Sequence, residues 1–155
     1  MPIIFARVDD RLIHGQIVQA WLPELNVDEV VIPCSKRRAS SLNQALLRLS
    51  LPFEYALTIL DSHEAVQYAR KSNKRIFLLM SSLQEMADLI EDGLQIKSIN
   101  IGGMHFKEHA QKLAENVFLD TQDKHLLKIV KGLGIRIETR SVPNATSITI
   151  DEVLQ

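Results

Sequence analysis

Short apolar runs alternate with segments of helical periodicity along the chain. Runs typical of buried strands are Ile3 to Val8, Val30 to Ile32, Tyr55 to Leu60, Arg75 to Met80, Ser98 to Ile101, Asn116 to Leu119 and Ile135 to Thr139. Segments that predict helices are Gly15 to Leu25, Ser40 to Leu49, Ser62 to Lys71, Ser82 to Asp92 and Thr121 to Leu133, with a short terminal helix over Ile148 to Leu154. The alternation predicts one α/β domain spanning 1–155, an open, twisted, mostly parallel sheet of about seven strands with helices on both faces.

Two helix starts carry local signals. Ser82 is a candidate N-cap with Glu85 three residues later, and Gly93 follows the helix as a stop. Thr121 is the candidate N-cap of the helix over 121–133. These signals predict where the two helices begin and where the first of them ends.

Composition limits the class of protein without naming a function. The 155 residues carry a formal net charge of −1, which favours neither nucleic acid nor an anionic membrane as a partner. No apolar run is long enough to span a bilayer, and the first residues lack a secretory signal. Cys34 is the single cysteine, so no internal disulfide can form, as expected in a reducing cytoplasm. A cytoplasmic protein is therefore predicted.

The loop after the first predicted strand concentrates the chemistry. Ligands of open parallel sheets lie outside the carboxyl ends of the strands. There the sequence reads Asp-Asp-Arg-Leu-Ile-His-Gly-Gln over 9–16, which places two carboxylates, a guanidinium and an imidazole before a helix. An imidazole is a good nucleophile near neutral pH, and the free N–H groups of a first helical turn can receive a phosphate. The cluster favours the handling of a phosphoryl group on His14.

The neighbours of His14 have supporting roles in this hypothesis. Arg11 offers a planar fork of donors to phosphate oxygens, and Gly15 removes a Cβ that would obstruct the backbone. Asp9 or Asp10 could hold Arg11 or orient the imidazole through its second nitrogen. The alternative is structural: both aspartates cap the helix, while Arg11 and His14 lie on the surface.

A family resemblance changes the balance between these alternatives. The stretch RVDDRLIHGQIV over 7–18, followed by Ala20 and Trp21, resembles the opening signature of the IIB components of mannose/fructose/sorbose-type sugar phosphotransferase systems. The stretch IKSINIGGMHFK over 96–107 resembles a later signature, and VFLD over 117–120 and IETRSVP over 137–143 are also similar. The resemblance therefore extends over the whole chain.

The resemblance implies a phosphocarrier. A IIA domain would pass a phosphoryl group to Nδ1 of His14, with Arg11 stabilising it and Asp9, Asp10, Gly15 and Gln16 in support. The group would then pass to the sugar as membrane subunits IIC and IID bring it across, so the protein would associate peripherally with that transporter. Neither a metal nor an organic cofactor is implied. The sugar, the oligomeric state (a homo-oligomer included) and the existence of cognate IIC and IID subunits are left open.

Three further motifs have more than one interpretation. Gly102 and Gly103 either line the pocket of His14 with backbone amides or form a turn that needs positive φ. His105 and His109 have the spacing of a helical metal pair, but no third ligand is evident. The basic run at 36–38, a departure from the family pattern, is either a docking element or a solvated loop; its residues are Lys36, Arg37 and Arg38.

Two other functions compete with a transport-coupled carrier. The first is a regulatory phosphoprotein in which His14 is phosphorylated but serves no sugar transporter. The second is an unrelated α/β enzyme acting on a small phosphorylated metabolite at the same loop. Discharge of the phosphoryl group to sugar distinguishes the carrier from the first, and a requirement for partner proteins distinguishes it from the second.

Overall fold

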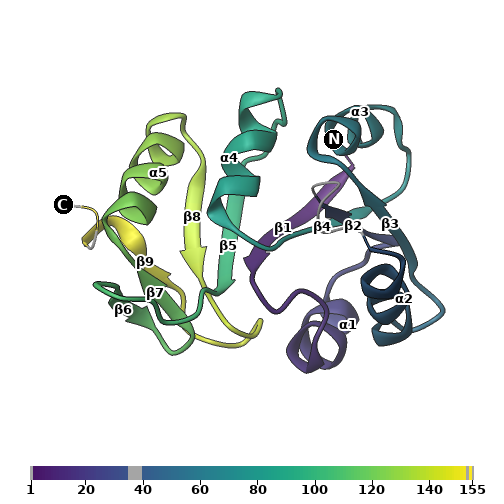
Figure 1. Ribbon diagram of the computed structural model, residues 1–155, viewed down its shortest axis with the longest axis horizontal. Coiled ribbons are helices and arrows are strands. Elements are labelled where there is room, and N and C mark those ends of the chain that lie inside the picture. The colour runs from purple at the N-terminus through teal and green to yellow at the C-terminus, as the bar shows by residue number, and fades with distance from the viewer. Residues whose placement is uncertain (1, 35–39, 153, 155) are drawn as a thin grey trace.

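The computed structural model describes residues 2–34, 40–152 and 154, and it has one main sheet beside a small hairpin (Figure 1). The main sheet has the order β3-β2-β4-β1-β5-β8-β9. Its strands are β1 (Ile3–Asp9), β2 (Glu29–Pro33), β3 (Ala56–Leu60), β4 (Ile76–Met80), β5 (Ser98–Gly103), β8 (Arg136–Thr139) and β9 (Ile148–Thr149). All pairings are parallel except that of β8 with β9. The predicted mostly parallel α/β sheet is confirmed.

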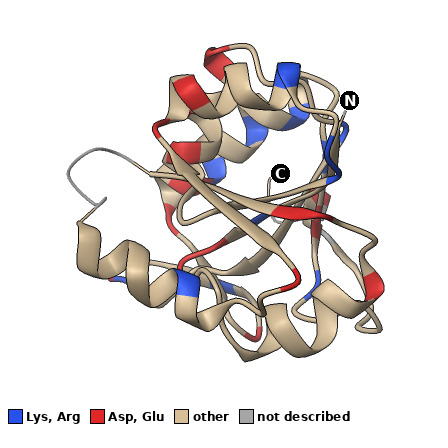
Figure 2. Ribbon diagram, turned by 90° about the vertical axis from the view of Figure 1, so that its right-hand side faces the viewer, with Lys and Arg blue, Asp and Glu red and all other residues tan. Residues whose placement is uncertain are grey.

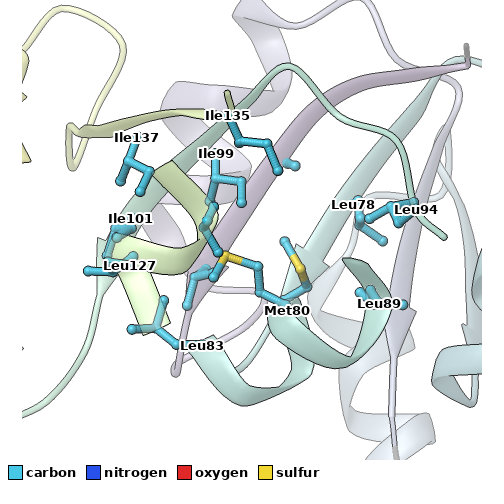
Figure 3. Packing of buried hydrophobic residues seen from close by; sticks show 14 of the residues in the cluster. Leu78, Met80, Leu83, Leu89, Leu94, Ile99, Ile101, Leu127, Ile135 and Ile137 are labelled. Carbon is cyan, nitrogen blue, oxygen red and sulfur yellow. The ribbon is translucent and has the colours of Figure 1, made fainter. Parts of the chain in front are cut away.

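Helices cover both faces of the sheet, as predicted. They are the π-helical turn η1 (Ile17–Trp21) with its continuation α1 (Leu22–Glu24), α2 (Ser41–Ser50), α3 (Ser62–Lys71), α4 (Leu83–Glu91) and α5 (Thr121–Gly132). Buried residues form two clusters, one beneath η1 and α1 and one beneath α3, α4 and α5. Figure 3 shows the second, in which Met80 and Ile99 of the sheet meet Leu83 and Leu89 of α4.

Two predicted elements differ from the structure. The strand expected over 116–119 exists as β7 (Val117–Leu119), but it pairs antiparallel with β6 (Gln111–Ala114) in a separate hairpin. A single bridge between Met104 and Val117 connects that hairpin to the main sheet. The terminal helix expected over 148–154 is wrong: β9 is followed by only the short 3₁₀ turn η2 (Ile150–Glu152). The β-branched residues of this segment favour a strand, and β9 pairs with the outer edge of β8.

One of the two predicted helix caps is confirmed. The Ser82 hydroxyl accepts from the N–H of Glu85, and Gly93 takes a φ of +98° after α4. The helix over 121–132 is capped by Asp120 rather than Thr121. The Asp120 carboxylate accepts from the N–H of Asp123, and the Asp123 carboxylate accepts from the N–H of Asp120. The reciprocal pair satisfies two helix-end groups, which a single hydroxyl cannot do.

The apolar face of α2 is largely exposed. None of the ten residues of α2, all of them described, is buried, and its leucines at 42, 46 and 49 remain on the surface. Arg48 is the only charged residue of the helix, whose ribbon is mostly tan in Figure 2. The periodicity predicted the helix correctly, but helical spacing alone does not say that a face packs against the core.

Core and surface leucines should therefore differ strongly in their effect on stability. Leu89→Ala should lower the free energy of unfolding by about 2–5 kcal/mol, because Leu89 is fully buried against the sheet. The matched variant Leu49→Ala should change it by less than about 0.5 kcal/mol, because 78% of Leu49 is exposed. Urea unfolding followed by circular dichroism measures both. Equal losses would mean that α2 packs more closely than the structure shows.

Candidate functional site

The loop between β1 and η1 begins at the carboxyl end of a central strand. Asp9 is the last residue of β1, which lies between β4 and β5 in the sheet. The N–H of Leu12 donates to the Asp9 carbonyl over 3.0 Å, and Leu12 takes a φ of +56°, unusual for a leucine. The His14 carbonyl then accepts from the N–H of Val18 over 3.0 Å, which starts the helix. A tight, strained turn thus places His14 at a helix N-terminus, as predicted.

The Asp9 carboxylate is the centre of the site. It is fully buried, and three side chains converge on it. Arg7 donates from Nη2 to Oδ2 over 2.9 Å, and Arg11 donates from Nε to Oδ1 over 3.0 Å and from Nη2 to Oδ2 over 3.1 Å. Nε2 of His14 lies 2.9 Å from Oδ2. Asp9 is therefore the aspartate that both holds Arg11 and orients the imidazole.

The contact with Asp9 determines which nitrogen of His14 can react. An ionised carboxylate only accepts hydrogen bonds, so Nε2 carries the proton in a neutral ring. Nδ1 then keeps its lone pair, and among the described residues only the N–H of Gln16 donates to it, over a long 3.4 Å. The His14 side chain is 17% exposed, which leaves the ring accessible from one side. The geometry presents Nδ1 as a nucleophile.

Asp9 is held in its charged form. Burial by itself would raise the pKa of this carboxyl, but the hydrogen bonds from His14 and Arg11 and the charge of Arg7 outweigh it. The pKa of Asp9 therefore lies well below its usual range. With two guanidinium groups beside one carboxylate, the cluster carries a net positive charge when His14 is neutral. Such a site attracts a phosphoryl group.

Acid stability should depend on Asp9. A carboxyl whose pKa is lower in the folded than in the unfolded protein stabilises the fold above about pH 4, and this contribution is lost as the pH falls toward the folded pKa. Asp9→Asn should therefore reduce the loss of stability between about pH 4 and pH 2 relative to the wild type. Urea unfolding at a series of pH values measures the two slopes. Parallel curves would show that Asp9 is not specially stabilised as an anion.

Arg11 is the accessible guanidinium of the site. Its side chain is 38% exposed, and its Nη2 also donates to Oε1 of Gln16 over 3.2 Å. No described residue accepts from Nη1. The contacts with Asp9 and Gln16 fix the plane of the guanidinium and leave one edge open to an incoming anion.

Arg7 is a member of the site that the motif analysis did not assign. It is fully buried, and besides Asp9 it donates from Nη1 to Oδ1 of Asn100 over 2.7 Å and to the Arg140 carbonyl over 2.9 Å. A charge inside an otherwise apolar strand was the signal that could have found it, because buried charges need dedicated partners.

The glycine pair at the end of β5 has a third explanation. Neither Gly102 nor Gly103 has a positive φ, so the prediction of a positive-φ turn is wrong. A methyl group on Gly102 would collide with the Arg7 guanidinium, and one on Gly103 would lie 2.5 Å from Oδ1 of Asp9. Both positions lack a side chain because the polar groups of β1 occupy the space.

The remaining predicted residues have distinct positions. Asp10 accepts from the N–H of His105 over 2.7 Å and pairs with its ring, so it does not contact Arg11 or His14. Neither aspartate caps the helix, so the capping part of the structural alternative for this loop is wrong. Its other part holds for Arg11, which is exposed. A Cβ on Gly15 would meet nothing within 4 Å, which leaves open space beside His14. The basic residues at 36–38 lie outside the described part of the chain.

Comparison with known proteins identifies the family. The family model described as "PTS system sorbose subfamily IIB component" matches residues 3–155. The sorbose-specific EIIB component of Lacticaseibacillus casei is 32% identical over 160 residues, which cover 99% of this chain and 98% of that protein. The mannose-specific EIIAB component of Escherichia coli K12 is 30% identical over 145 residues, which cover 92% of this chain and 45% of that longer protein.

A solved structure agrees with the fold. The IIBSor domain of the sorbose permease from Klebsiella pneumoniae superposes with a TM-score of 0.87 at 29% identity, covering 99% of this chain and 96% of that chain. In the described part of this chain, no helix has both the length and the apolar character needed to cross a membrane. The chain belongs to the sorbose/mannose family of phosphotransferase-system IIB components, phosphocarriers that act through a phosphohistidine intermediate.

Proposed function

We propose that His14 is the phosphoryl acceptor of this IIB component and that it reacts through Nδ1. The observation that carries the proposal is the 2.9 Å contact between Nε2 of His14 and the buried Asp9 carboxylate. It fixes the ring and leaves the lone pair on Nδ1. The domain concerned is the single α/β unit of 1–155.

The transfer step needs no proton to leave the ring. The Nδ1 lone pair forms a bond to phosphorus while the bond between phosphorus and the donor histidine of IIA breaks, and its electron pair returns to that donor. His14 then carries a positive ring with its proton still on Nε2, beside the Asp9 carboxylate. Asp9 thus stabilises the charge that develops as the group arrives. In the forward transfer, a sugar hydroxyl attacks the same phosphorus atom while the bond between phosphorus and Nδ1 breaks, and the electron pair of that bond returns to His14. The hydroxyl loses its proton to solvent or to a base on the sugar-binding partner.

Two features of the loop suit the phosphoryl oxygens. The open edge of Arg11 can donate to them, and a phosphoryl-transfer transition state gains from such fixed positive charge. The start of the helix, with the space beside Gly15, offers backbone N–H groups to the same oxygens. Gln16 supports the first feature by holding Arg11, and Asp10 anchors the loop through His105.

The partners in this proposal are other components of the same kind of system. In the mannose-specific EIIAB relative, the printed name joins an A and a B component, which supports a IIA domain as donor. The membrane subunits IIC and IID and the sugar they bring across are the proposed acceptor side. The protein would then work in the cytoplasm at the membrane transporter.

The experiment is phosphoryl transfer from a phosphorylated mannose-type IIA domain to the purified protein. Labelled protein is digested under alkaline conditions that preserve phosphohistidine, and the label is mapped by mass spectrometry. Label on His14 supports the proposal, and discharge to sugar in the presence of IIC and IID supports the transport role. Label on another histidine would contradict it, and a stable label on His14 that never reaches sugar would favour a regulatory phosphoprotein.

A further inference from the structure

The buried Arg7 side chain connects the site to three distant parts of the chain. Its Nη1 is held by Oδ1 of Asn100 on β5 and by the Arg140 carbonyl after β8, and Nη2 approaches the Ser141 carbonyl at 3.3 Å. The guanidinium carbon lies 5.2 Å from the centre of the Trp21 ring. These contacts fill its donors on the side away from Asp9, so the group cannot rotate without losing several of them at once.

The surroundings of Arg7 are themselves fixed. The indole N–H of Trp21 donates to the Ser141 carbonyl over 2.8 Å, and the guanidinium carbon of Arg140 lies 5.4 Å from the centre of the Trp21 ring. Arg140 in turn donates to Glu138 over 2.8 Å. Trp21 belongs to the helix that begins at His14, so one buried cluster ties the helix, β5 and the segment after β8 to the same guanidinium.

We propose that Arg7 is a positioning residue, which holds the Asp9 carboxylate and through it fixes the proton of His14 on Nε2. The inference rests on the proposed role of His14 and adds the element that determines which ring nitrogen is reactive. Asp9 touches three side chains, and Arg7 is the one that is fully buried and tied to other strands. Arg11 is partly exposed and would also donate to a phosphoryl group, so it does not hold the position of Asp9 as firmly as Arg7 does.

The charges around the His14 ring predict how a displacement of Arg7 changes the protonation of that ring. The groups facing Asp9 and His14 are the guanidinium groups of Arg7 and Arg11, and behind Arg7 lies the pair of Arg140 and Glu138. Asp10 of the same loop is paired with His105, which follows β5. Moving Arg7 away leaves Asp9 less neutralised, which favours a protonated His14. It also removes the contact that holds the Asp9 carboxylate in place, so the carboxylate can turn away from Nε2 and the ring proton can reach Nδ1.

Gly102→Ala tests the inference without changing any ionisable group. The added methyl group would occupy the place of the Arg7 guanidinium and displace it. We expect the acid limb of the pH profile of phosphoryl acceptance to move to higher pH, because a less neutralised Asp9 favours the protonated imidazole. Acceptance at pH 6.5 should fall severalfold and recover at alkaline pH. Nitrogen-15 NMR of the imidazole should show Nε2–H in the wild type and a mixture of tautomers in the variant.

The controls separate positioning from structure. Gly132→Ala adds the same methyl group where nothing lies within 4 Å, and it should behave as the wild type in both measurements. Asn100→Ala removes one anchor of Arg7 and keeps all charges; it should shift the profile in the same direction by less, and it is measured if Gly102→Ala does not fold. A folded variant with a lower melting temperature but a wild-type tautomer and pH profile would overturn the inference. A wild type that takes no label at all would instead contradict the proposed function, while the NMR result still tests Arg7.

Discussion

A protein with alanine in place of His14 is expected to take no phosphoryl group from a phosphorylated IIA domain. The reason is chemical, because Nδ1 of His14 is the only accessible ring nitrogen that the buried carboxylate of Asp9 orients. The fold should survive, since His14 lies in a loop and its loss leaves Asp9 paired with Arg7 and Arg11. Removing one hydrogen bond costs about 1 kcal/mol. Transfer of labelled phosphate, with circular dichroism of the same sample, measures both expectations.

The matched controls for this variant are two exposed histidines that lie outside the loop of 9–16. His63 lies in the first turn of α3 and His125 on the exposed face of α5. Alanine at either position should leave labelling at the wild-type level. Full labelling of the His14→Ala protein would refute the assignment, and loss of label in the His63→Ala protein would show that the assay reports a docking surface rather than the acceptor.

Arg11→Ala should slow phosphoryl transfer by about 10²-fold, as the loss of a fixed charge-stabilising donor does at other sites. The variant loses the open guanidinium edge, and it also loses two of the hydrogen bonds that hold Asp9. Rapid-quench measurement of transfer from phosphorylated IIA gives the rate. Stability should change little, because the Arg11 side chain is more than one third exposed.

Arg11→Lys distinguishes charge from geometry. Lysine keeps the positive charge but cannot bind Asp9 with two parallel donors while it offers a third to phosphate. A rate between those of the alanine variant and the wild type is expected. If both variants transfer at the wild-type rate, Arg11 has only a structural role and the helix N-terminus must supply the stabilisation.

Much of the site was accessible from the sequence because the loop is local. The residues from Asp9 to Gln16 are contiguous, and the rule that ligands lie at the carboxyl ends of parallel strands placed them correctly. The His14 and Arg11 side chains reach Asp9 across five and two residues, so their meeting depends on one turn and not on the whole fold. The sequence left open which of the two aspartates orients the ring.

The partners of β1 could not be predicted in the same way. Arg7 meets Asn100 and the Arg140 carbonyl across 93 and 133 residues, and only the strand order β4-β1-β5-β8 brings them together. Gly102 and Gly103 looked like a turn, because the sequence shows a missing side chain but not the group that fills its place. The exposed face of α2 and the separate hairpin of β6 and β7 could not be predicted for the same reason. They depend on which other segments of the chain cover the faces and edges of the main sheet.

The sequence by itself determined the class of fold, the family and the loop that is proposed to carry the chemistry. These follow from periodicity, local spacing and a contiguous motif, all of which act over a few residues. The tertiary structure decided that Asp9 and not Asp10 contacts His14, that this contact is made by Nε2 and not by Nδ1, and that Arg7 lies behind Asp9. The physical reason is burial: a charged group removed from water must find its partners wherever the packed strands place them, and those positions are distant along the chain.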